Sequence, residues 1–191
     1  MRKYAFAAFL AASVATPAFA QDTAPFTGFR LEGLVGYDSA GNEDVDNDSG
    51  VAYGVGAGYD FQMGNMVAGI EGEYADSTVD ECVQDFEVAG DELCAQVGRD
   101  LYVGGRIGSL VGPQTLLYGK AGYTNARLET EYDPVTGDNV EVGDNLDGVR
   151  LGAGLEHAIG PNSFVKAEYR YSNYEDGFEK HQALAGFGFR F

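Results

Sequence analysis

From Gly28 onward, hydrophobic and polar residues alternate along most of the chain. The alternation has a period of two, which is the side-chain period of a β-strand. It breaks and resumes to give eight segments, at 28–38, 50–61, 66–76, 99–108, 115–126, 147–157, 163–174 and 183–191. Each has about ten residues, which is the length that a tilted strand needs to cross a bilayer. The pattern predicts eight membrane-spanning strands.

The two faces of these segments differ in charge. The apolar rows carry no charged residue between their first and last positions. The opposite faces carry Asp38 and Asp60 and, as the candidates for the lumen, seven bases and six further acids: Arg30, Glu32, Glu71, Glu73, Asp100, Arg106, Lys120, Arg150, Glu156, Lys166, Glu168, Arg170 and Arg190. A closed eight-stranded barrel has an interior just wide enough for side chains, and ions buried there must be paired. We therefore expect these thirteen residues to form an ion-pair network in the lumen, with the apolar rows facing lipid.

The connections between the segments alternate in length. Short turns at 62–65, 109–114 and 158–162 alternate with four longer, acidic connections. Short periplasmic turns and long external loops are typical of an outer-membrane barrel. The predicted fold is therefore all-β, an eight-stranded antiparallel up-and-down transmembrane β-barrel over 28–191, preceded by a periplasmic segment at 21–27.

Aromatic residues argue against the structural alternative, a soluble β-sandwich or lipocalin-like barrel. They group at the two ends of the strands, as expected for the aromatic girdles of a membrane barrel. The loop ends carry Tyr37, Tyr53, Tyr74, Tyr123 and Tyr171, and the turn ends carry Phe29, Phe61, Phe164, Phe187, Phe189 and Phe191.

The first twenty residues have the order of a secretory signal. Basic Arg2 and Lys3 precede an apolar stretch, and the small-residue pattern Ala18-Phe19-Ala20 follows it. We expect cleavage before Gln21. A retained N-terminal anchor is the alternative, but the apolar stretch is shorter than the roughly 20 residues that a spanning helix needs.

The chain is strongly acidic, with 30 Asp and Glu against 12 Lys and Arg and a formal net charge of −18. Phosphate contacts need Lys and Arg, so nucleic acid is excluded as a partner. The pattern calls for no cofactor. Acidic loops instead suggest weak binding of divalent cations, which would bridge to lipopolysaccharide phosphates; a loop that is simply solvated is the alternative.

Three stretches carry a family resemblance. Ala183 to Phe191, 164–174 and 151–156 resemble the last three strands of small OmpA/OmpX-like, opacity-type outer-membrane barrels. The resemblance implies that Phe187, Phe189 and Phe191 form the signal read by the barrel-assembly machinery. We expect the barrel to be a monomer among outer-membrane lipid and lipopolysaccharide. Members of this family serve envelope integrity, adhesion to host surfaces or evasion of defence.

Cys82 and Cys94 lie in the second long connection. In the oxidising compartment of an exported protein, a disulfide is expected. A metal or redox site is the alternative, but the CxxC spacing and neighbouring histidines that would support it are missing.

Asp44 to Gly50 places carboxylates at alternate positions, as at the start of an EF-hand calcium loop. The glycine stands one place late, and Val55 occupies the position of the bidentate glutamate. The motif is therefore only a partial match, and no metal ligands are assigned.

No catalytic residues are assigned. The two histidines, His157 and His181, are expected at opposite ends of the barrel. His181 lies near Glu179 and near Ser172 of the neighbouring strand, which leaves an acid–base pair as the enzymatic alternative. A narrow porin is the third alternative, although eight strands leave a filled lumen. A structural role at the cell surface is the preferred interpretation, and adhesion is the second.

Overall fold

The computed structural model describes residues 25–42, 45–78, 80–84, 92–133 and 140–191. Within these ranges lie nine strands and one short 3-10 helix: β1 (Gly28–Asn42), β2 (Val45–Met63), β3 (Met66–Ser77), β4 (Asp80–Gln84), β5 (Glu92–Gly112), β6 (Thr115–Asp133), β7 (Val140–Ala158), β8 (Ser163–Tyr174), η1 (Glu175–Gly177) and β9 (Glu179–Arg190). None of the helical structure described is long and apolar enough to cross a membrane.

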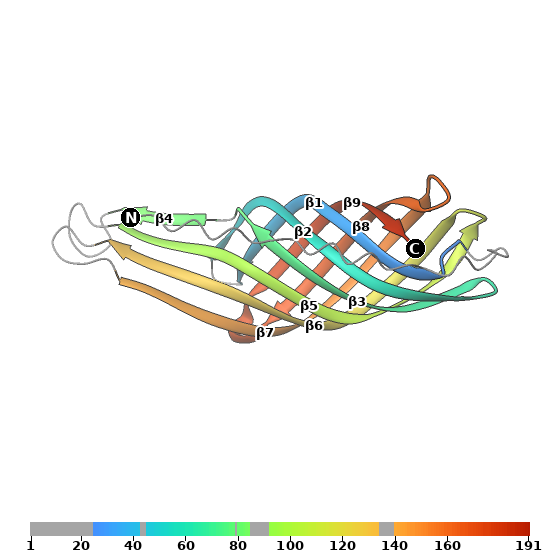
Figure 1. Ribbon diagram of the computed structural model, residues 1–191. Coiled ribbons are helices and arrows are strands. Elements are labelled where there is room, and N and C mark those ends of the chain that lie inside the picture. Colours follow the sequence, from blue (N-terminus) through green and yellow to red (C-terminus); the bar gives the residue numbers. More distant parts are fainter. Residues whose placement is uncertain (1–24, 43–44, 79, 85–91, 134–139) are drawn as a thin grey trace, which may run out of the picture.

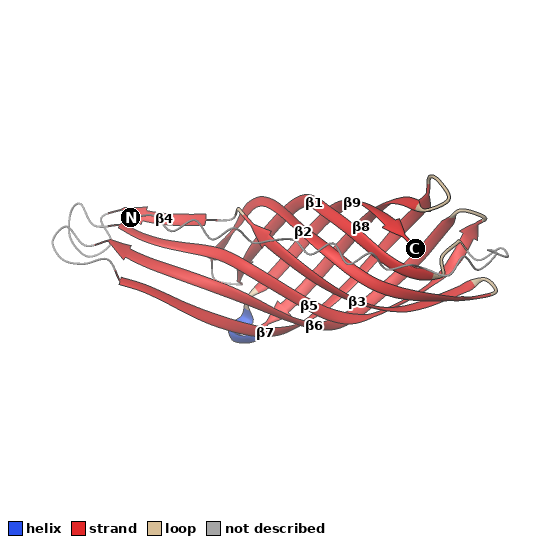
Figure 2. Ribbon diagram, viewed as in Figure 1, coloured by secondary structure: helices blue, strands red, loops and turns tan. Residues whose placement is uncertain are grey.

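Eight of the strands form a closed antiparallel barrel. Sequential neighbours pair from β1 to β3, β3 pairs with β5, and pairing continues from β5 to β9. The barrel closes where β9 pairs with β1, from Arg30↔Arg190 to Gly41↔Glu179. Figures 1 and 2 show the strands tilted steeply around the barrel axis. The predicted fold class is confirmed.

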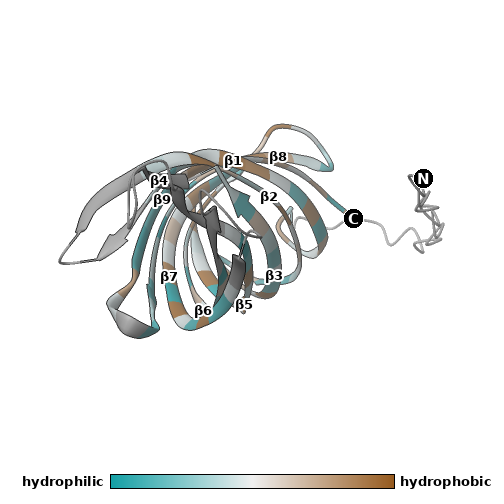
Figure 3. Ribbon diagram, turned by 90° about the vertical axis from the view of Figure 1, so that its left-hand side faces the viewer, coloured by the Kyte–Doolittle hydropathy of each residue, from teal (hydrophilic) through white to brown (hydrophobic). Residues whose placement is uncertain are grey.

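Side chains alternate between the lumen and the outer surface along each strand. In β8, for example, Phe164, Lys166, Glu168 and Arg170 are buried and the residues between them are exposed. Figure 3 shows the same alternation as hydrophobic and hydrophilic bands along the ribbons. The prediction that Phe164 belongs to the outer aromatic girdle was wrong. Its side chain points into the lumen, with 1% of its surface exposed.

Three tight turns and the end of β9 lie at one end of the barrel, the right-hand end in Figure 1. In the β2–β3 turn, Gly64 has φ of +63°, a left-handed conformation that glycine adopts without strain. The end of β9 is fixed to β1 where the Phe191 amide donates to the Phe29 carbonyl at 2.8 Å. By the asymmetry of outer-membrane barrels, this is the periplasmic end.

The opposite, extracellular end is uneven in height. β6 and β7 pair as far out as Tyr132↔Val140, whereas the pairing of β7 with β8 begins only at Gly148↔Tyr174. β4 adds to the outer part of β5. A four-stranded sheet of β4, β5, β6 and β7, which we name the projecting sheet, therefore extends beyond the barrel rim, toward the left in Figure 1.

The long connections differ from the prediction in two places. Much of the chain expected as loops around the projecting sheet is strand, because ladder hydrogen bonds continue past the membrane. The connection from β8 to β9 is also short, a single turn through η1 in which Gly177 has φ of +73°. The prediction of four long loops was wrong for this one.

The calcium motif does not have the form that its sequence suggested. Residues 45–50 belong to β2, with Ser49 opposite Ser39 and Asp48 opposite Ala40. An extended ladder does not wrap around an ion as an EF-hand loop does, so the described part of the motif gives no support to a calcium loop. Asp44, its first residue, lies outside the described residues. Across the described ranges, no group of three or more potential metal ligands comes together.

The strand register places Cys82 of β4 directly opposite Cys94 of β5. Directly opposed residues of antiparallel strands have Cβ atoms roughly 4.5–5.5 Å apart, close to the spacing of a disulfide. The pairing therefore stays a prediction with a favourable backbone register.

We expect the mature protein, denatured without reductant, to expose no titratable thiol and to gain two thiols on reduction. Chain entropy would give this cross-link about 3 kcal/mol of stabilisation. Alkylation followed by mass spectrometry measures the thiol count. Alkylation of both cysteines without reductant would contradict the disulfide, and the Cys82→Ser/Cys94→Ser variant gives the baseline.

Candidate functional site

The lumen is filled by ionised side chains in equal numbers. Among the described residues, eight bases and eight acids are buried there: Arg30, Arg106, Lys120, Arg150, Lys166, Arg170, Lys180, Arg190, Glu32, Asp38, Asp60, Glu71, Glu73, Asp100, Glu156 and Glu168. They include all thirteen residues named from the sequence. Asp38, Asp60 and Lys180 are additional. The alternation already placed Asp38 and Asp60 on the inner face, although they were not counted among the paired ions. It could have indicated Lys180 as well, because Lys180 shares a face with Gln182 on β9.

Asp60 is the centre of the layer nearest the periplasm. Arg106 donates to both of its oxygens, at 2.8 and 2.6 Å, the two-pronged geometry that makes guanidinium–carboxylate pairs strong. Arg190 Nη2 lies 2.9 Å from Asp60 Oδ2 and 2.8 Å from Glu156 Oε1. Glu156 also accepts from Arg106 at 2.9 Å. Two arginines and two acids therefore form a closed ring of contacts.

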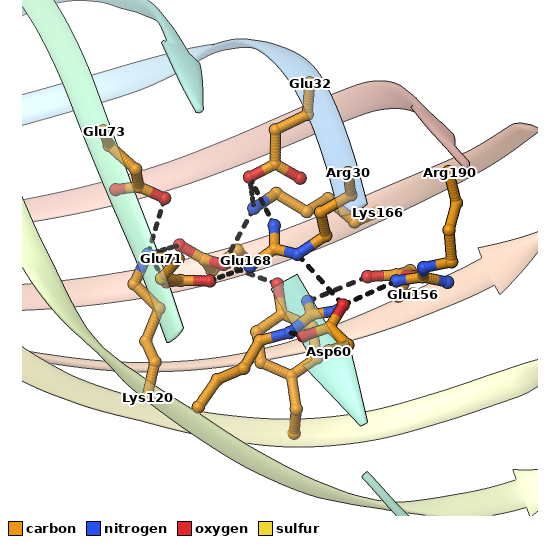
Figure 4. Close-up of polar contacts among 12 residues, drawn as sticks. Arg30, Glu32, Asp60, Glu71, Glu73, Lys120, Glu156, Lys166, Glu168 and Arg190 are labelled. Atoms are coloured by element: carbon orange, nitrogen blue, oxygen red, sulfur yellow. Dashed lines mark hydrogen bonds and ion pairs between the residues drawn. The ribbon is translucent and has the colours of Figure 1, made fainter. Parts of the chain in front are cut away.

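Arg30 connects this layer to the middle of the barrel. Its guanidinium lies 3.2 Å from Asp60 and 3.0 Å from Glu32, and it also pairs with Glu71. Figure 4 shows Arg30 between the two groups of side chains. The charged lumen is thus one continuous network along this part of its length.

The middle layer is organised around Glu168. Its carboxylate lies 3.0 Å from Lys120 Nζ and 3.2 Å from Lys166 Nζ, and it pairs with Arg170. Tyr118 Oη donates to the same carboxylate at 2.5 Å. The neighbouring acids complete the cations' contacts, with Lys166 2.7 Å from Glu32 and Lys120 and Arg170 2.7 and 2.8 Å from Glu73.

The layer nearest the cell exterior is centred on Asp100. Arg150 Nη2 lies 2.5 Å from Asp100 Oδ2, and Thr124 and Tyr174 donate to the same carboxylate at 2.9 and 3.1 Å. Lys180 lies 3.0 Å from Asp38 and 3.6 Å from Asp100. Charged side chains therefore cross the lumen at three successive levels.

A buried aromatic side chain fills the periplasmic end of the lumen. Phe26, just before β1, is fully buried against Val67, Leu116 and Tyr118. Its amide donates to Gln62 Oε1 at 3.1 Å. The Arg190 guanidinium lies 5.3 Å from the ring centroid, within the range of a cation–π contact. The segment before β1 therefore folds into the barrel mouth.

Glycines on the inner rows make room for these long side chains. A Cβ on Gly56 would lie 2.9 Å from Glu32 Oε1, and one on Gly58 would lie 3.0 Å from Arg30 Nη2. Larger residues at these places would displace the ions from their partners. The glycine rows are thus part of the packing of a filled lumen.

The structure separates the residues of the enzymatic alternative. Ser172 is fully buried and accepts from Arg150 Nε at 2.8 Å. His181 lies on the outer surface, where its Nδ1 is 2.7 Å from Tyr169 Oη, and Glu179 accepts from Tyr171 at 2.6 Å. His157, near the other end, contacts Thr115. Ser172 and His181 therefore face opposite sides of the barrel wall and form no acid–base pair.

The three phenylalanines of the proposed assembly signal lie on the outer surface at the periplasmic end. Phe187, Phe189 and Phe191 are each about half exposed, and the rings of Phe187 and Phe189 pack edge to face with centroids 5.1 Å apart. They are accessible to a protein partner within the membrane. Their recognition by the assembly machinery stays a prediction.

Comparison with known proteins agrees with this geometry. The chain matches the family model of the outer membrane protein beta-barrel domain over residues 5–191. It is 26% identical over 160 residues to a 22 kDa outer membrane protein of Rhizobium leguminosarum bv. viciae, covering 73% of this chain and 67% of that protein.

Solved structures share the fold at low identity. The attachment invasion locus protein Ail of Yersinia pestis superposes with a TM-score of 0.56 at 18% identity, over 86% of this chain and 99% of that one. A major outer membrane protein from Thermus thermophilus gives 0.57 at 12% identity, over 86% and 99%. The chain is an outer-membrane protein and belongs to the outer membrane protein beta-barrel family.

Proposed function

We propose that this protein is a structural component of the outer membrane, a barrel that supports the envelope and neither conducts solutes nor catalyses a reaction. The observation that supports this most is the filled lumen, in which eight bases and eight acids pair at three levels. Ion pairs cross the lumen at each of these levels, so a solute that entered would have to separate paired charges.

Planar-bilayer recording tests the absence of conduction. The refolded mature chain should insert without producing stable open-channel steps, because any ion entering the lumen would have to displace paired charges. Persistent steps at moderate voltage would contradict a sealed barrel and favour the narrow porin.

Loss of the gene tests the envelope role. A strain without the protein should become more sensitive to detergents and hydrophobic antibiotics, and the wild-type gene should restore resistance. The His157→Ala/His181→Ala variant should restore it equally, because neither histidine lies in the lumen. Normal resistance in the deletion strain would overturn the structural role. If the wild-type gene restored resistance and the histidine variant did not, the result would point to an enzymatic activity that uses a histidine.

Adhesion is the second candidate, and one feature favours it. The projecting sheet stands clear of the rim, and over Val140–Asp147 β7 has no described neighbour on its β8 side. An unpaired strand edge can add an extended segment of another protein through backbone hydrogen bonds. Its charged residues, including Asp144 and Asp147, would favour a basic partner.

A shortened hairpin tests adhesion. Replacing residues 128–144 with Asn-Gly would join Arg127 to Asn145, which face each other in the register, by a two-residue turn that suits a hairpin. Cells displaying this variant should adhere less to host surfaces than cells displaying the full chain. Equal adhesion, with both proteins folded by gel mobility, would remove this candidate.

A further inference from the structure

The residues just before β1 reach the opposite wall of the barrel. Phe26 is fully buried. Its side chain packs in one cluster with Val67 of β3 and with Leu116 and Tyr118 of β6. Around the barrel, β6 is four strands away from β1 in either direction, which is the position directly across the lumen. Residues 25–27, which we name the N-terminal strap, therefore span the periplasmic mouth.

Polar contacts fix the strap to both neighbours of β1. On the β2 side, the Phe26 amide donates to Gln62 Oε1 at 3.1 Å, and the Gln62 amide donates to Thr27 Oγ1 at 3.0 Å. On the β9 side, Arg190 Nη1 donates to the Pro25 carbonyl oxygen at 3.2 Å, and the Arg190 guanidinium lies 5.3 Å from the centroid of the Phe26 ring. The strap is therefore held by β2, β3, β6 and β9, although it directly precedes β1.

The seam between β1 and β9 is the pairing of residues most distant in sequence. It joins the first strand of the barrel to the last, whereas the other neighbouring strands of the barrel follow one another along the chain. Chain entropy opposes contacts between distant segments most strongly. We therefore expect this seam to close last when the barrel folds.

The surroundings of Phe26 are complete only in the closed barrel. Val67 and Leu116 lie on strands that are reached from β1 through β2, whereas Arg190 lies on the other side of the seam. Before the seam closes, neither β6 nor β9 has a fixed position relative to β1. The strap can therefore dock completely only after closure.

We propose that the N-terminal strap is a latch that docks after the seam has closed and slows the opening of the barrel. An interaction that is absent from the folding transition state leaves the folding rate unchanged and acts fully on the unfolding rate. A buried phenylalanine is sufficient for this, because its replacement by alanine typically shifts an unfolding equilibrium by about 100-fold or more. The latch concerns the persistence of the fold and is independent of the envelope and adhesion roles.

The folding and unfolding rates of Phe26→Ala test the proposal. The mature chain is refolded into lipid vesicles and unfolded by urea, and the folded fraction is followed over time by gel mobility. The variant should unfold about 30- to 100-fold faster than the wild type, while its folding rate stays within about twofold. Phe26→Leu keeps an apolar side chain and should show a smaller increase in the unfolding rate.

Phe164→Ala is the matched control. Phe164 is also buried at the periplasmic end, and the Arg190 guanidinium lies 5.3 Å from its ring centroid as well. It belongs to β8, however, and covers Gly188 of the paired strand, where a Cβ would overlap the ring. Its packing therefore forms when β8 and β9 pair, so this replacement should slow folding by about fivefold or more in addition to speeding unfolding.

Photo-cross-linking tests the docking itself. A diazirine analogue of phenylalanine at position 26 should cross-link to residues 115–120 of β6 once the barrel is folded, because Leu116 and Tyr118 share its cluster. During refolding, this product should appear only in the gel band with the mobility of the folded form. Mass spectrometry of each band locates the cross-link.

Four results would overturn the proposal. A folding rate of Phe26→Ala that falls as much as its unfolding rate rises would mean that the strap docks before closure. Unchanged rates in both directions would mean that it fastens nothing. Cross-links to β6 in the unfolded band would contradict docking after closure. An effect of Phe164→Ala confined to unfolding would make late packing a property of the whole periplasmic end and not of the strap.

Discussion

Replacing Glu168 with glutamine is expected to lower the free energy of unfolding by about 3–5 kcal/mol, the usual cost of removing one partner from a buried ion pair. The carboxylate contacts Lys120, Lys166 and Arg170 and accepts from Tyr118. The variant keeps the shape of the side chain and removes its charge, so the loss reports the uncompensated cations. Gel mobility of the folded fraction across a urea series in lipid vesicles measures it.

Two further variants make this test specific. Glu179→Gln makes the same chemical change on the outer rim, where Glu179 contacts Tyr171, and should cost much less because water screens the charge there. Lys166→Met combined with Glu168→Gln restores equal numbers of charges and should recover part of the loss. Similar losses for Glu168→Gln and Glu179→Gln would contradict a dry, paired lumen.

Replacing Ile70 with arginine is expected to destabilise the barrel by about 2–4 kcal/mol, the cost of a cation at the bilayer midplane on the lipid face. Ile70 is 69% exposed in the outward row of β3, between Met66 at the periplasmic turn and Tyr74 at the aromatic band. The same urea series in vesicles measures the change.

Met66→Arg is the control, because the penalty falls to about 0–1 kcal/mol near the interfaces. A barrel whose outer surface faced water would tolerate both substitutions. Equal, small effects at the two positions would therefore contradict a lipid-facing row and return the soluble β-barrel to consideration.

The alternation of side chains was sufficient to predict the barrel and the number of its strands. This is because every strand of the barrel faces lipid on its outer side and packed charges on its inner side, which imposes the same two-residue period on all of them. The projecting sheet was missed because outside the membrane no apolar row is required. The outer parts of β5, β6 and β7 therefore lack the alternation and resemble acidic loops.

The pairing of the lumen charges had to come from the structure. Alternation assigns Arg30 and Glu168 to one face, but which ions meet depends on how the strands are staggered when the barrel closes. Lys180 was missed because its neighbours Glu179 and His181 are polar, which hides the apolar row at that end of β9. We predicted Phe164 on the outer surface because aromatic residues group in the girdles at the strand ends. Its position two residues before Lys166 puts it on the same, inner face of β8.

The equal numbers of fixed positive and negative charges in the lumen also determine how the barrel responds to an electric field. A potential of 100 mV acts with about 2.3 kcal/mol on each elementary charge that moves across a membrane. Since the eight bases and eight acids cancel, a Donnan potential across the outer membrane pulls on them in opposite directions with equal strength. The barrel as a whole is held in place by its lipid and its strand ladder, whatever the sign of that potential.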